Sequence, residues 1–321
     1  MTASVAAPAA APPLKRKVLV RRHGLLVRVT HWINALCLVF MLLSGLQIFN
    51  AHPALYWGPD ARFDRPWVSM TAEENGARLK GVTQIGSARF DTTGILGASK
   101  VGGEDTPRAL PTWLTLPASQ NLALGRRWHF FWAWVFALNV TLYLVSSLIN
   151  GHLRRDLAPT GQQLKPSHIL REIVDHARLR FPRGEEARRY NVLQKGAYLG
   201  VAVLLLPLMI LTGMTMSPSL DAAFPWLLTL FGGRQSARSI HFIVANLIVL
   251  FFLVHIVMVV LSGLWNNIRS MITGRYAIDV EEAAPVDPAP AAEAPSHDPP
   301  PERPAQPETE PSAPMPQGDP A

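Results

Sequence analysis

The sequence predicts an all-α membrane protein: a bundle of four transmembrane helices with a long outer loop and a disordered C-terminal tail. The chain has 321 residues, of which 49% are hydrophobic, and its formal net charge is +7, a balance typical of membrane spans with polar extensions. Four long stretches contain no Asp, Glu, Lys or Arg, and each approaches or exceeds the ~20 residues that a spanning helix needs. These stretches are 31–49, 128–149, 196–216 and 240–265.

The segments outside these stretches divide the chain into three parts. Residues 1–20 are rich in Ala and Pro and end in a basic cluster, so we expect a disordered N-terminal segment that precedes a retained first span, not a cleaved signal peptide. Residues 21–275 form the predicted four-helix domain. Residues 276–321 are rich in Pro, Ala and Glu and cannot bury a core, which predicts a disordered tail.

Two of the connections have recognisable character. The outer segment, 50–127, contains three tryptophans, and because a tryptophan in a loop needs something to pack against, we expect an ordered cap or docking surface. The inner connection alternates Leu, Ile and Val with Arg and His over 168–189, which predicts a short amphipathic helix on the membrane surface.

The distribution of basic residues predicts the orientation. Arg and Lys are frequent before the first span and between the second and third, whereas only Arg234 and Arg238 lie between the third and fourth. Cytoplasmic loops carry the excess of Lys and Arg, so we expect both termini in the cytoplasm. The predicted location is the inner membrane of a bacterium, with the outer segment on the opposite side.

The fourth span carries two histidines at an informative spacing. His241 and His255 are 14 residues apart, which is about 3.9 helical turns, so both project from one face about 21 Å apart. A polar side chain in hydrocarbon is costly and often marks a functional site. For either histidine alone, an interfacial or packing role is an equally good interpretation.

Histidines in the other spans supply partners at matching depths. His31 stands at the inner end of the first span and His129 at the outer end of the second. Matching by depth pairs His129 with His241 outside and His31 with His255 inside. Two imidazoles that face one another are the axial ligands of a six-coordinate haem b, so the pattern predicts two haems b. Zinc fits less well, because its structural sites gather four ligands at one place.

The lone cysteine and three arginines bear on the same prediction. Cys37 lies within the first span, so neither an internal disulfide nor a thiolate metal site is available, and a cofactor must be held by nitrogen or oxygen ligands. Arg28, Arg126 and Arg238 each precede a predicted ligand by three residues. Each guanidinium would lie one turn toward water, where it could pair with a haem propionate. An equally good interpretation of each is an interfacial anchor.

Gly45 follows His31 by 14 residues and therefore lies on the same face, at about the depth of the outer haem. A porphyrin could pass closely where the helix has no side chain. Ordinary packing of small residues between membrane helices is the competing explanation.

These motifs resemble the b-type cytochrome subunits of nickel-iron hydrogenases and the gamma subunits of membrane-bound formate dehydrogenases. The resemblance covers the four spans and rests on residues 28–32 (RVTHW), the four histidines and residues 190–195 (YNVLQK). Residues 52–58 (HPALYWG) and the long outer segment are closer to the branch of thiosulfate reductase cytochrome b subunits. The resemblance implies two haems b, a partner docked at the outer face and a quinone site near the inner haem, with Asn191 and Gln194 as its candidate residues. From the sequence alone, Asn191 and Gln194 could equally cap the third span.

The predicted function is electron transfer across the membrane between a quinone pool and a periplasmic redox enzyme, such as a molybdopterin or iron-sulfur protein. The chain would be an electron-transfer subunit with membrane lipid, quinone and that enzyme as partners, and no nucleic acid. One alternative is a stand-alone di-haem oxidoreductase that moves electrons from a small donor such as superoxide to quinone. A second is a membrane anchor or sensor whose histidines bind nothing.

Overall fold

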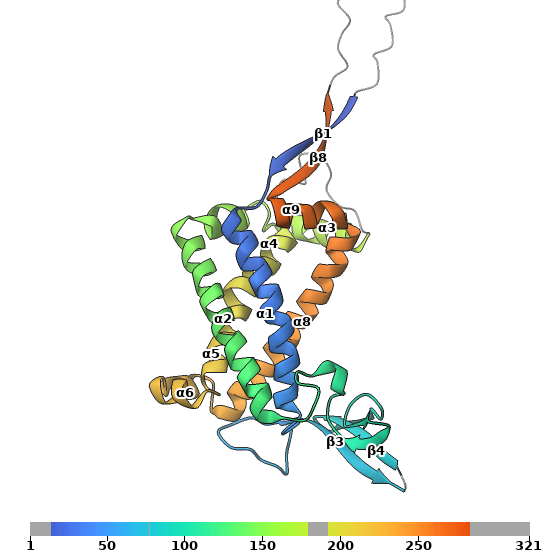
Figure 1. The fold of residues 1–321 in the computed structure, drawn as a ribbon. Helices are drawn as coiled ribbons and strands as arrows, with labels where there is room; N and C mark the ends of the chain where they lie inside the picture. The colour runs from blue at the N-terminus through green and yellow to red at the C-terminus, as the bar shows by residue number, and fades with distance from the viewer. Residues whose placement is uncertain (1–13, 77, 179–191, 283–321) are drawn as a thin grey trace, which may run out of the picture. The chain divides into compact units, whose positions relative to one another are not determined.

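A computed structural model describes residues 14–76, 78–178 and 192–282 of the chain (Figure 1). The four-helix core and its connections lie within one compact unit, Lys15–Glu281. Most of the two predicted disordered segments, and residue 191, lie outside the described residues.

Four helices in the described residues are long and apolar enough to cross a membrane, as the sequence predicts. The first is α1, Leu25–Phe49; the second is α2, Leu122–Ile149; the fourth is α8, Arg234–Leu261. The third span, Val192–Met214, is continuous but divided into α4 (Val192–Leu199), the π-helical segment η4 (Gly200–Leu205) and α5 (Leu206–Met214). In Figure 1, α1 and α8 run alongside one another between the two ends of the bundle.

The observed spans differ from the predicted ones at their ends for physical reasons. α1 begins six residues before the predicted boundary of 31, since a long aliphatic stem lets Arg28 sit in the first turns while its charge reaches the helix end. α8 ends at Leu261 instead of continuing to 265, because Gly263 adopts the left-handed conformation that stops a helix. The chain then turns into α9, Leu264–Thr273.

Packing between the long helices is mainly α1 against α2 and α5 against α8. A buried cluster of Cys37, Phe136 and Val140 joins α1 to α2, and Met209 of α5 packs against it. Asn139 of α2 ties the two helices further, because its Nδ2 donates to Thr30 O at 2.9 Å.

The prediction of an all-α protein is wrong. The described residues contain eight strands in three antiparallel sheets, and most of them lie in the outer segment that the sequence predicts as a loop. These strands are short and bury only a few residues each, such as Val68 and Val82, so they need no long apolar run. The strands are β1 (Leu14–Arg21), β2 (Ala54–Leu55), β3 (Val68–Asn75), β4 (Arg78–Ile85), β5 (Ala88–Asp91), β6 (Ala98–Val101), β7 (Glu104–Pro107) and β8 (Arg275–Glu282).

The outer segment is an ordered small domain. Strands β2, β3, β4 and β5 form a four-stranded sheet in sequence order, and β6 pairs with β7 beside it. Gly97 has φ +82°, and a Cβ there would stand 2.3 Å from Thr71 O, so only glycine allows the two sheets to approach this closely. Trp57 stacks on Trp67 with ring centroids 5.5 Å apart, whereas Trp113 is 77% exposed.

Apolar packing and buried hydrogen bonds fasten this outer domain to the ends of the helices. Phe49 of α1 belongs to a buried cluster with Leu55 and Val68. Trp67 Nε1 donates to Ser239 Oγ of α8 at 2.9 Å. At Gly233, just before α8, a Cβ would lie 2.5 Å from the Pro59 Cα, so the two backbones touch. The domain therefore sits directly on the first turns of α8.

The opposite end of the bundle carries short helices and a two-stranded sheet. After α2 come the π-helical turn η2, Leu153–Leu157, and the helix α3, Pro166–Ala177. Helix α3 confirms a helix over the described part of the segment predicted to be amphipathic, residues 168–189, of which 179–189 lie outside the described residues. Strands β1 and β8 pair with one another and extend into 14–20 and 276–282, where the sequence predicts no structure. The other short helices are η1 (Thr112–Leu114), α6 (Pro218–Ala223) and α7 (Trp226–Leu230), which lie in the outer domain and between the third and fourth spans.

Candidate functional site

The four histidines singled out in the sequence form two pairs. His129 of α2 faces His241 of α8, with ring centroids 6.4 Å apart and an angle of 66° between the ring planes. His31 of α1 faces His255 of α8, with centroids 6.3 Å apart and an angle of 58°. These are the two pairs predicted from depth alone, and α8 contributes one member to each.

The separation within each pair is the one that a bridging metal ion requires. An imidazole nitrogen lies about 1.1 Å from its ring centroid and a metal–imidazole bond is about 2.0 Å long, so two rings facing one metal end-on have centroids about 6.2 Å apart. The separations of 6.3 and 6.4 Å are close to this value, so each pair could accommodate one metal ion between its rings. The angle between the planes is free, because each ring can rotate about its metal–nitrogen bond.

Hydrogen bonds fix the tautomer of His129. Its Nδ1 lies 3.2 Å from Met41 O and 3.2 Å from Ser44 Oγ, both on α1. A carbonyl oxygen only accepts, so Nδ1 must carry the proton and donate. The Nε2 atom is then left unprotonated, and an unprotonated nitrogen is what a metal ligand needs.

The same arrangement recurs at His241. Its Nδ1 lies 2.9 Å from Thr212 Oγ1 of α5. The Thr212 hydroxyl already donates to Leu208 O at 2.6 Å, so toward the imidazole it accepts. His241 therefore also donates through Nδ1 and presents an unprotonated Nε2 to His129.

A glycine follows each of these hydroxyl residues. A Cβ at Gly45, next to Ser44, would lie 3.2 Å from His129 Cε1. A Cβ at Gly213, next to Thr212, would lie 3.5 Å from His241 Cε1. The spacing in the sequence places Gly45 at this depth, and the structure brings it against the imidazole of His129. Ser44, Thr212 and Gly213 are missed in the sequence; the repeated hydroxyl–glycine pair on two spans is the signal that could have found them.

The inner pair has an apolar and aromatic setting. Trp32 meets the His31 ring edge-on at 5.3 Å, and Phe251 stacks on His255 at 5.8 Å. His31 Nδ1 is buried and has no hydrogen-bond partner among the described residues. The described contacts of this ring are therefore packing contacts with Trp32 and His255.

The three arginines near the ligands have different surroundings. Arg28 Nη1 donates to Ile272 O of α9. Arg126 is exposed, with its guanidinium 5.6 Å from the Phe130 ring centroid. Arg238 Nη1 donates to Ala54 O at 2.9 Å, and Arg238 Nη2 donates to His52 O. Both acceptors lie in the outer domain. Arg238 therefore fastens the outer domain to α8, and pairing of all three with propionates stays a prediction.

The remaining candidates divide between described and undescribed residues. Gln194 lies in the first turn of α4. Asn191 lies outside the described residues. His52, which is not one of the predicted ligands, bonds through Nε2 to the Tyr56 hydroxyl at 3.1 Å. Burial lowers the pKa of His52, and the positive charge of Arg238 acts in the same direction.

The donor set is suited to haem and not to zinc. Among the described residues no three His, Cys, Asp or Glu side chains gather as a possible metal site. A zinc site needs three or four protein ligands, whereas a haem iron with four porphyrin nitrogens needs only two. Two isolated imidazole pairs at a metal-bridging separation therefore fit a bis-histidine haem.

Comparison with known proteins agrees with this geometry. The family model described as prokaryotic cytochrome b561 matches residues 22–274. A protein of Azospira oryzae named "Putative protein-methionine-sulfoxide reductase subunit YedZ1" is 26% identical over 252 residues, which cover 78% of this chain and 96% of that protein. No solved structure matches the chain.

Proposed function

The chain belongs to the prokaryotic cytochrome b561 family, and from this premise we propose that it carries two haems b and passes electrons between a quinone pool and a periplasmic redox enzyme. Membership confirms the resemblance to b-type cytochrome subunits and identifies a multi-pass membrane protein that binds haem b and transfers electrons. The closer likeness to the thiosulfate reductase branch stays a prediction.

The observation that supports two haems is the pair of nearly equal separations at two depths. The centroid distances of 6.3 and 6.4 Å each suit one iron between two imidazoles. His241 and His255 share α8, and 14 residues of helix hold them about 21 Å apart along its axis. When bound at both levels, haem supplies reversible one-electron transfer, and this spacing arranges the two carriers in series through the bilayer.

The residues of this chain hold and orient the proposed axial ligands. The Met41 carbonyl and the hydroxyls of Ser44 and Thr212 keep the protons of His129 and His241 on Nδ1. An imidazole that donates through Nδ1 is a more basic ligand through Nε2, which stabilises the oxidised iron. Both imidazoles of the outer pair have such acceptors, whereas His31 Nδ1 has none among the described residues. We therefore expect a lower reduction potential at the outer haem from this effect alone.

The proposed orientation puts the outer domain in the periplasm and both chain termini in the cytoplasm. The basic residues before α1 and between α2 and the third span support it, because Lys and Arg accumulate on the cytoplasmic side. In this orientation His129 and His241 lie at the periplasmic level, and His31 and His255 lie toward the cytoplasm.

The proposed partner is a molybdopterin or iron-sulfur redox protein that docks on the outer domain. The folded domain offers exposed aromatic side chains, Trp57 at 50% and Phe63 at 75% exposure, and aromatic residues are enriched at protein interfaces. Trp57 stacks on Trp67, which is hydrogen-bonded to α8 two residues before His241. The printed name of the Azospira relative describes a subunit, which also supports a partner.

We place the quinone site near His255, with Gln194 and Asn191 as its polar contacts. Gln194 belongs to α4, which lies at the end of the bundle where α1 begins (Figure 1), and His31 stands in the second turn of α1, which supports this assignment. An amide side chain can donate to a quinone carbonyl or accept from a quinol hydroxyl.

The decisive experiment counts haems. The purified chain should show a reduced b-type spectrum with two haems per polypeptide. His255→Ala should leave one haem, because a single imidazole cannot hold the inner iron in a six-coordinate site. His52→Ala, a histidine of the outer domain that is not in either pair, is the control and should keep both. Two haems in His255→Ala would overturn the assignment of the inner pair.

The two alternatives make different predictions. A membrane anchor or sensor predicts a purified chain without b-type absorbance. A stand-alone oxidoreductase predicts that the isolated chain reduces quinone with superoxide at a rate independent of any partner. An electron-transfer subunit predicts quinone-linked turnover only when a periplasmic redox protein is bound to the outer domain.

A further inference from the structure

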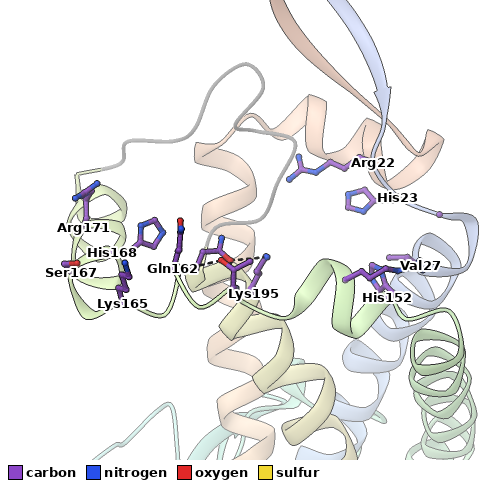
Figure 2. Close-up of a pocket in the computed structure, with 14 residues that line it drawn as sticks. Arg22, His23, Val27, His152, Gln162, Lys165, Ser167, His168, Arg171 and Lys195 are labelled. Carbon is purple, nitrogen blue, oxygen red and sulfur yellow. Dashed lines mark hydrogen bonds between the residues drawn. The ribbon is translucent and has the colours of Figure 1, made fainter.

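A large cavity lies at the end of the bundle where α1 begins and α2 ends (Figure 2). Its volume is about 800 Å³, and its walls come from the residues before α1, from η2, from the start of α3 and from α4. The lining includes three histidines and a set of Arg and Lys residues: Arg22, Arg155, Lys165, Arg171 and Lys195.

Four basic residues of the lining have no acidic partner among the described residues: Arg155, Lys165, Arg171 and Lys195. No Asp or Glu is part of the described lining. Lys195 is only 8% exposed, and its Nζ donates to two neutral acceptors, Ala158 O and Gln163 Oε1, each at 3.2 Å. The carboxylate of Glu172 lies 3.7 Å from His168 Nε2 but outside the lining. Because several cations held together cost free energy, an anion in the cavity would be strongly favoured.

The arrangement suits phosphate chemistry in particular. Arg22 lies at one end of the cavity and Arg171 at the other, with Lys195 between them (Figure 2). Guanidinium groups bind phosphate oxygens through paired charge-assisted hydrogen bonds, and Lys adds a point charge. Ser167 and His168, in the first turn of the 12-residue helix α3, also line the cavity, and the amino end of a helix attracts anions.

Burial keeps one of the lining histidines neutral. Burial lowers the pKa of His23 to about 4, and the positive charge of Arg22 acts in the same direction. At neutral pH this imidazole therefore adds no charge to the cavity.

The position of the cavity favours a lipid over a soluble phosphate. The end of α2 beside the cavity exposes Leu148 at 67% and Ile149 at 79%, and α3 exposes Leu170 at 61%. These apolar side chains would contact acyl chains while the basic walls hold the headgroup. A cavity of about 800 Å³ also exceeds what a single inorganic phosphate fills.

We propose that this basic cavity binds the phosphate-bearing headgroup of an anionic phospholipid. Among the described residues of the proposed quinone site, neither His255 nor Gln194 lines the cavity. Bound lipid would neutralise the cluster and hold η2 and α3 against the start of α1, which stabilises the inner end of the bundle.

The test counts lipids that stay bound to the purified haem-loaded protein. The detergent-solubilised chain is mixed with phosphatidylglycerol or phosphatidylcholine, and native mass spectrometry measures the lipid retained. We expect one phosphatidylglycerol per chain and little phosphatidylcholine. Arg155→Gln with Arg171→Gln should weaken phosphatidylglycerol binding by about tenfold or more, because each change removes a charged contact.

A matched variant separates a site from general surface charge. Arg154→Gln with Arg178→Gln removes the same charge from neighbouring positions outside the lining and should bind like the original chain. Equal losses in both variants, or equal retention of the two lipids by the unaltered chain, would overturn the proposal. Binding of inorganic phosphate that depends on Arg155 and Arg171, without retention of lipid, would assign the cavity to a soluble phosphate instead. The lipid comparison uses the unaltered chain and so does not depend on the folding of a variant.

Discussion

At each proposed outer ligand, a hydroxyl and a glycine stand side by side on a neighbouring helix. Ser44 and Thr212 accept from the Nδ1 atoms, while Gly45 and Gly213 leave room for the rings. The hydroxyls donate to the carbonyl one turn back, Phe40 O and Leu208 O, each at 2.6 Å. Because each hydroxyl proton is already donated to a carbonyl, the hydroxyl oxygen must accept from the histidine. Each histidine is therefore protonated on Nδ1.

Removal of one hydroxyl should change the potential of the outer haem. Thr212→Val keeps the shape of the side chain but removes the acceptor from His241 Nδ1. The imidazole then becomes a weaker donor to iron, so the reduction potential of one haem should rise by tens of millivolts, where a tenfold change in equilibrium corresponds to about 59 mV for one electron. A spectroscopic redox titration measures it.

The control for this experiment keeps the hydroxyl. Thr212→Ser retains the acceptor and should restore the original potential, whereas a purely structural role in filling space would not be rescued by the smaller side chain. Unchanged potentials in Thr212→Val would show that the hydroxyl does not act on the ligand.

A buried histidine outside the spans should make stability depend on pH. The pKa of His23 is lowered to about 4, first by burial and then by its neighbours Arg22, His31, His152 and Arg28. The folded state therefore holds His23 neutral while the unfolded chain takes up a proton near pH 6.5. The contribution of neutral His23 to the free energy of unfolding is complete above about pH 6.5 and is lost as the pH falls toward 4.

This pH effect can be measured as the thermal denaturation midpoint of the solubilised protein at several values between about pH 7.5 and 4. His23→Gln should flatten the decline, because glutamine takes up no proton. His168→Gln changes a histidine paired with Glu172 on α3 and should leave the decline as it was. An unaltered decline in His23→Gln would contradict the assignment.

At the scale of elements, the outer domain depends on a few contacts with α8. Arg238 donates to two carbonyls of the segment that follows α1, Trp67 bonds to Ser239, and Gly58 N donates to Ser236 Oγ at 2.8 Å. The first two turns of α8 thus anchor the domain just before His241. Movement of a docked partner on this domain would be transmitted directly to the helix that holds the outer ligand.

Loss of the Arg238 contacts should loosen the outer domain. Arg238→Gln leaves the carbonyl oxygens of His52 and Ala54 without their donor. We therefore expect severalfold faster limited proteolysis within 50–127. Arg234→Gln is the matched control, because Arg234 lies on the same helix and pairs with Asp221 of α6, not with the outer domain. If Arg238→Gln instead alters the haem spectrum and leaves proteolysis unchanged, the propionate role predicted from the sequence is the main one.

The elements that the sequence predicts well are those governed by the membrane. Hydrocarbon demands about 20 uncharged residues per helix, so four spans and the depth of each histidine follow from a simple count. The ends of α1 and α8 are less predictable, because the predicted ends depend on where charged residues occur. Arg28 is charged yet lies within α1, and the uncharged Gly263 follows the end of α8. The split of the third span coincides with Pro207 at the start of α5, because proline has no N–H to donate to the preceding turn.

The outer sheets are not predicted because the sequence pattern of their strands is weak. These strands are stabilised by contacts between segments distant in the sequence. β3 alternates buried and exposed residues only over part of its length, and β4 contains Gly81, which usually argues against a strand. Here Gly81 is required because a Cβ would lie 2.1 Å from Leu96 O of the adjoining segment. A contact between strands distant in sequence can be seen only once the fold is known.

For the whole molecule, the pairing of histidines is predictable while their supports are not. Depth in the bilayer is one-dimensional, so His31 and His129 can be matched to His255 and His241 without knowing which helices touch. Ser44 and Thr212 each contact a histidine on a neighbouring helix. The depth of a residue in the bilayer does not show which helices are neighbours, so these contacts cannot be predicted from depth. The basic cavity is similar, since its lining gathers separate stretches of chain at one end of the bundle.

Because α8 carries one histidine of each pair, the distance between the two proposed iron centres is set by the number of residues between His241 and His255. Inserting one residue between His241 and His255 would rotate one ligand by about 100° relative to the other. Only insertions or deletions near a whole turn, about three or four residues at a time, would keep both imidazoles aimed at their partners. The separation of the two redox centres can therefore change during evolution only in steps of about 5 Å, and every such step would have to be matched by the helices that carry His31 and His129.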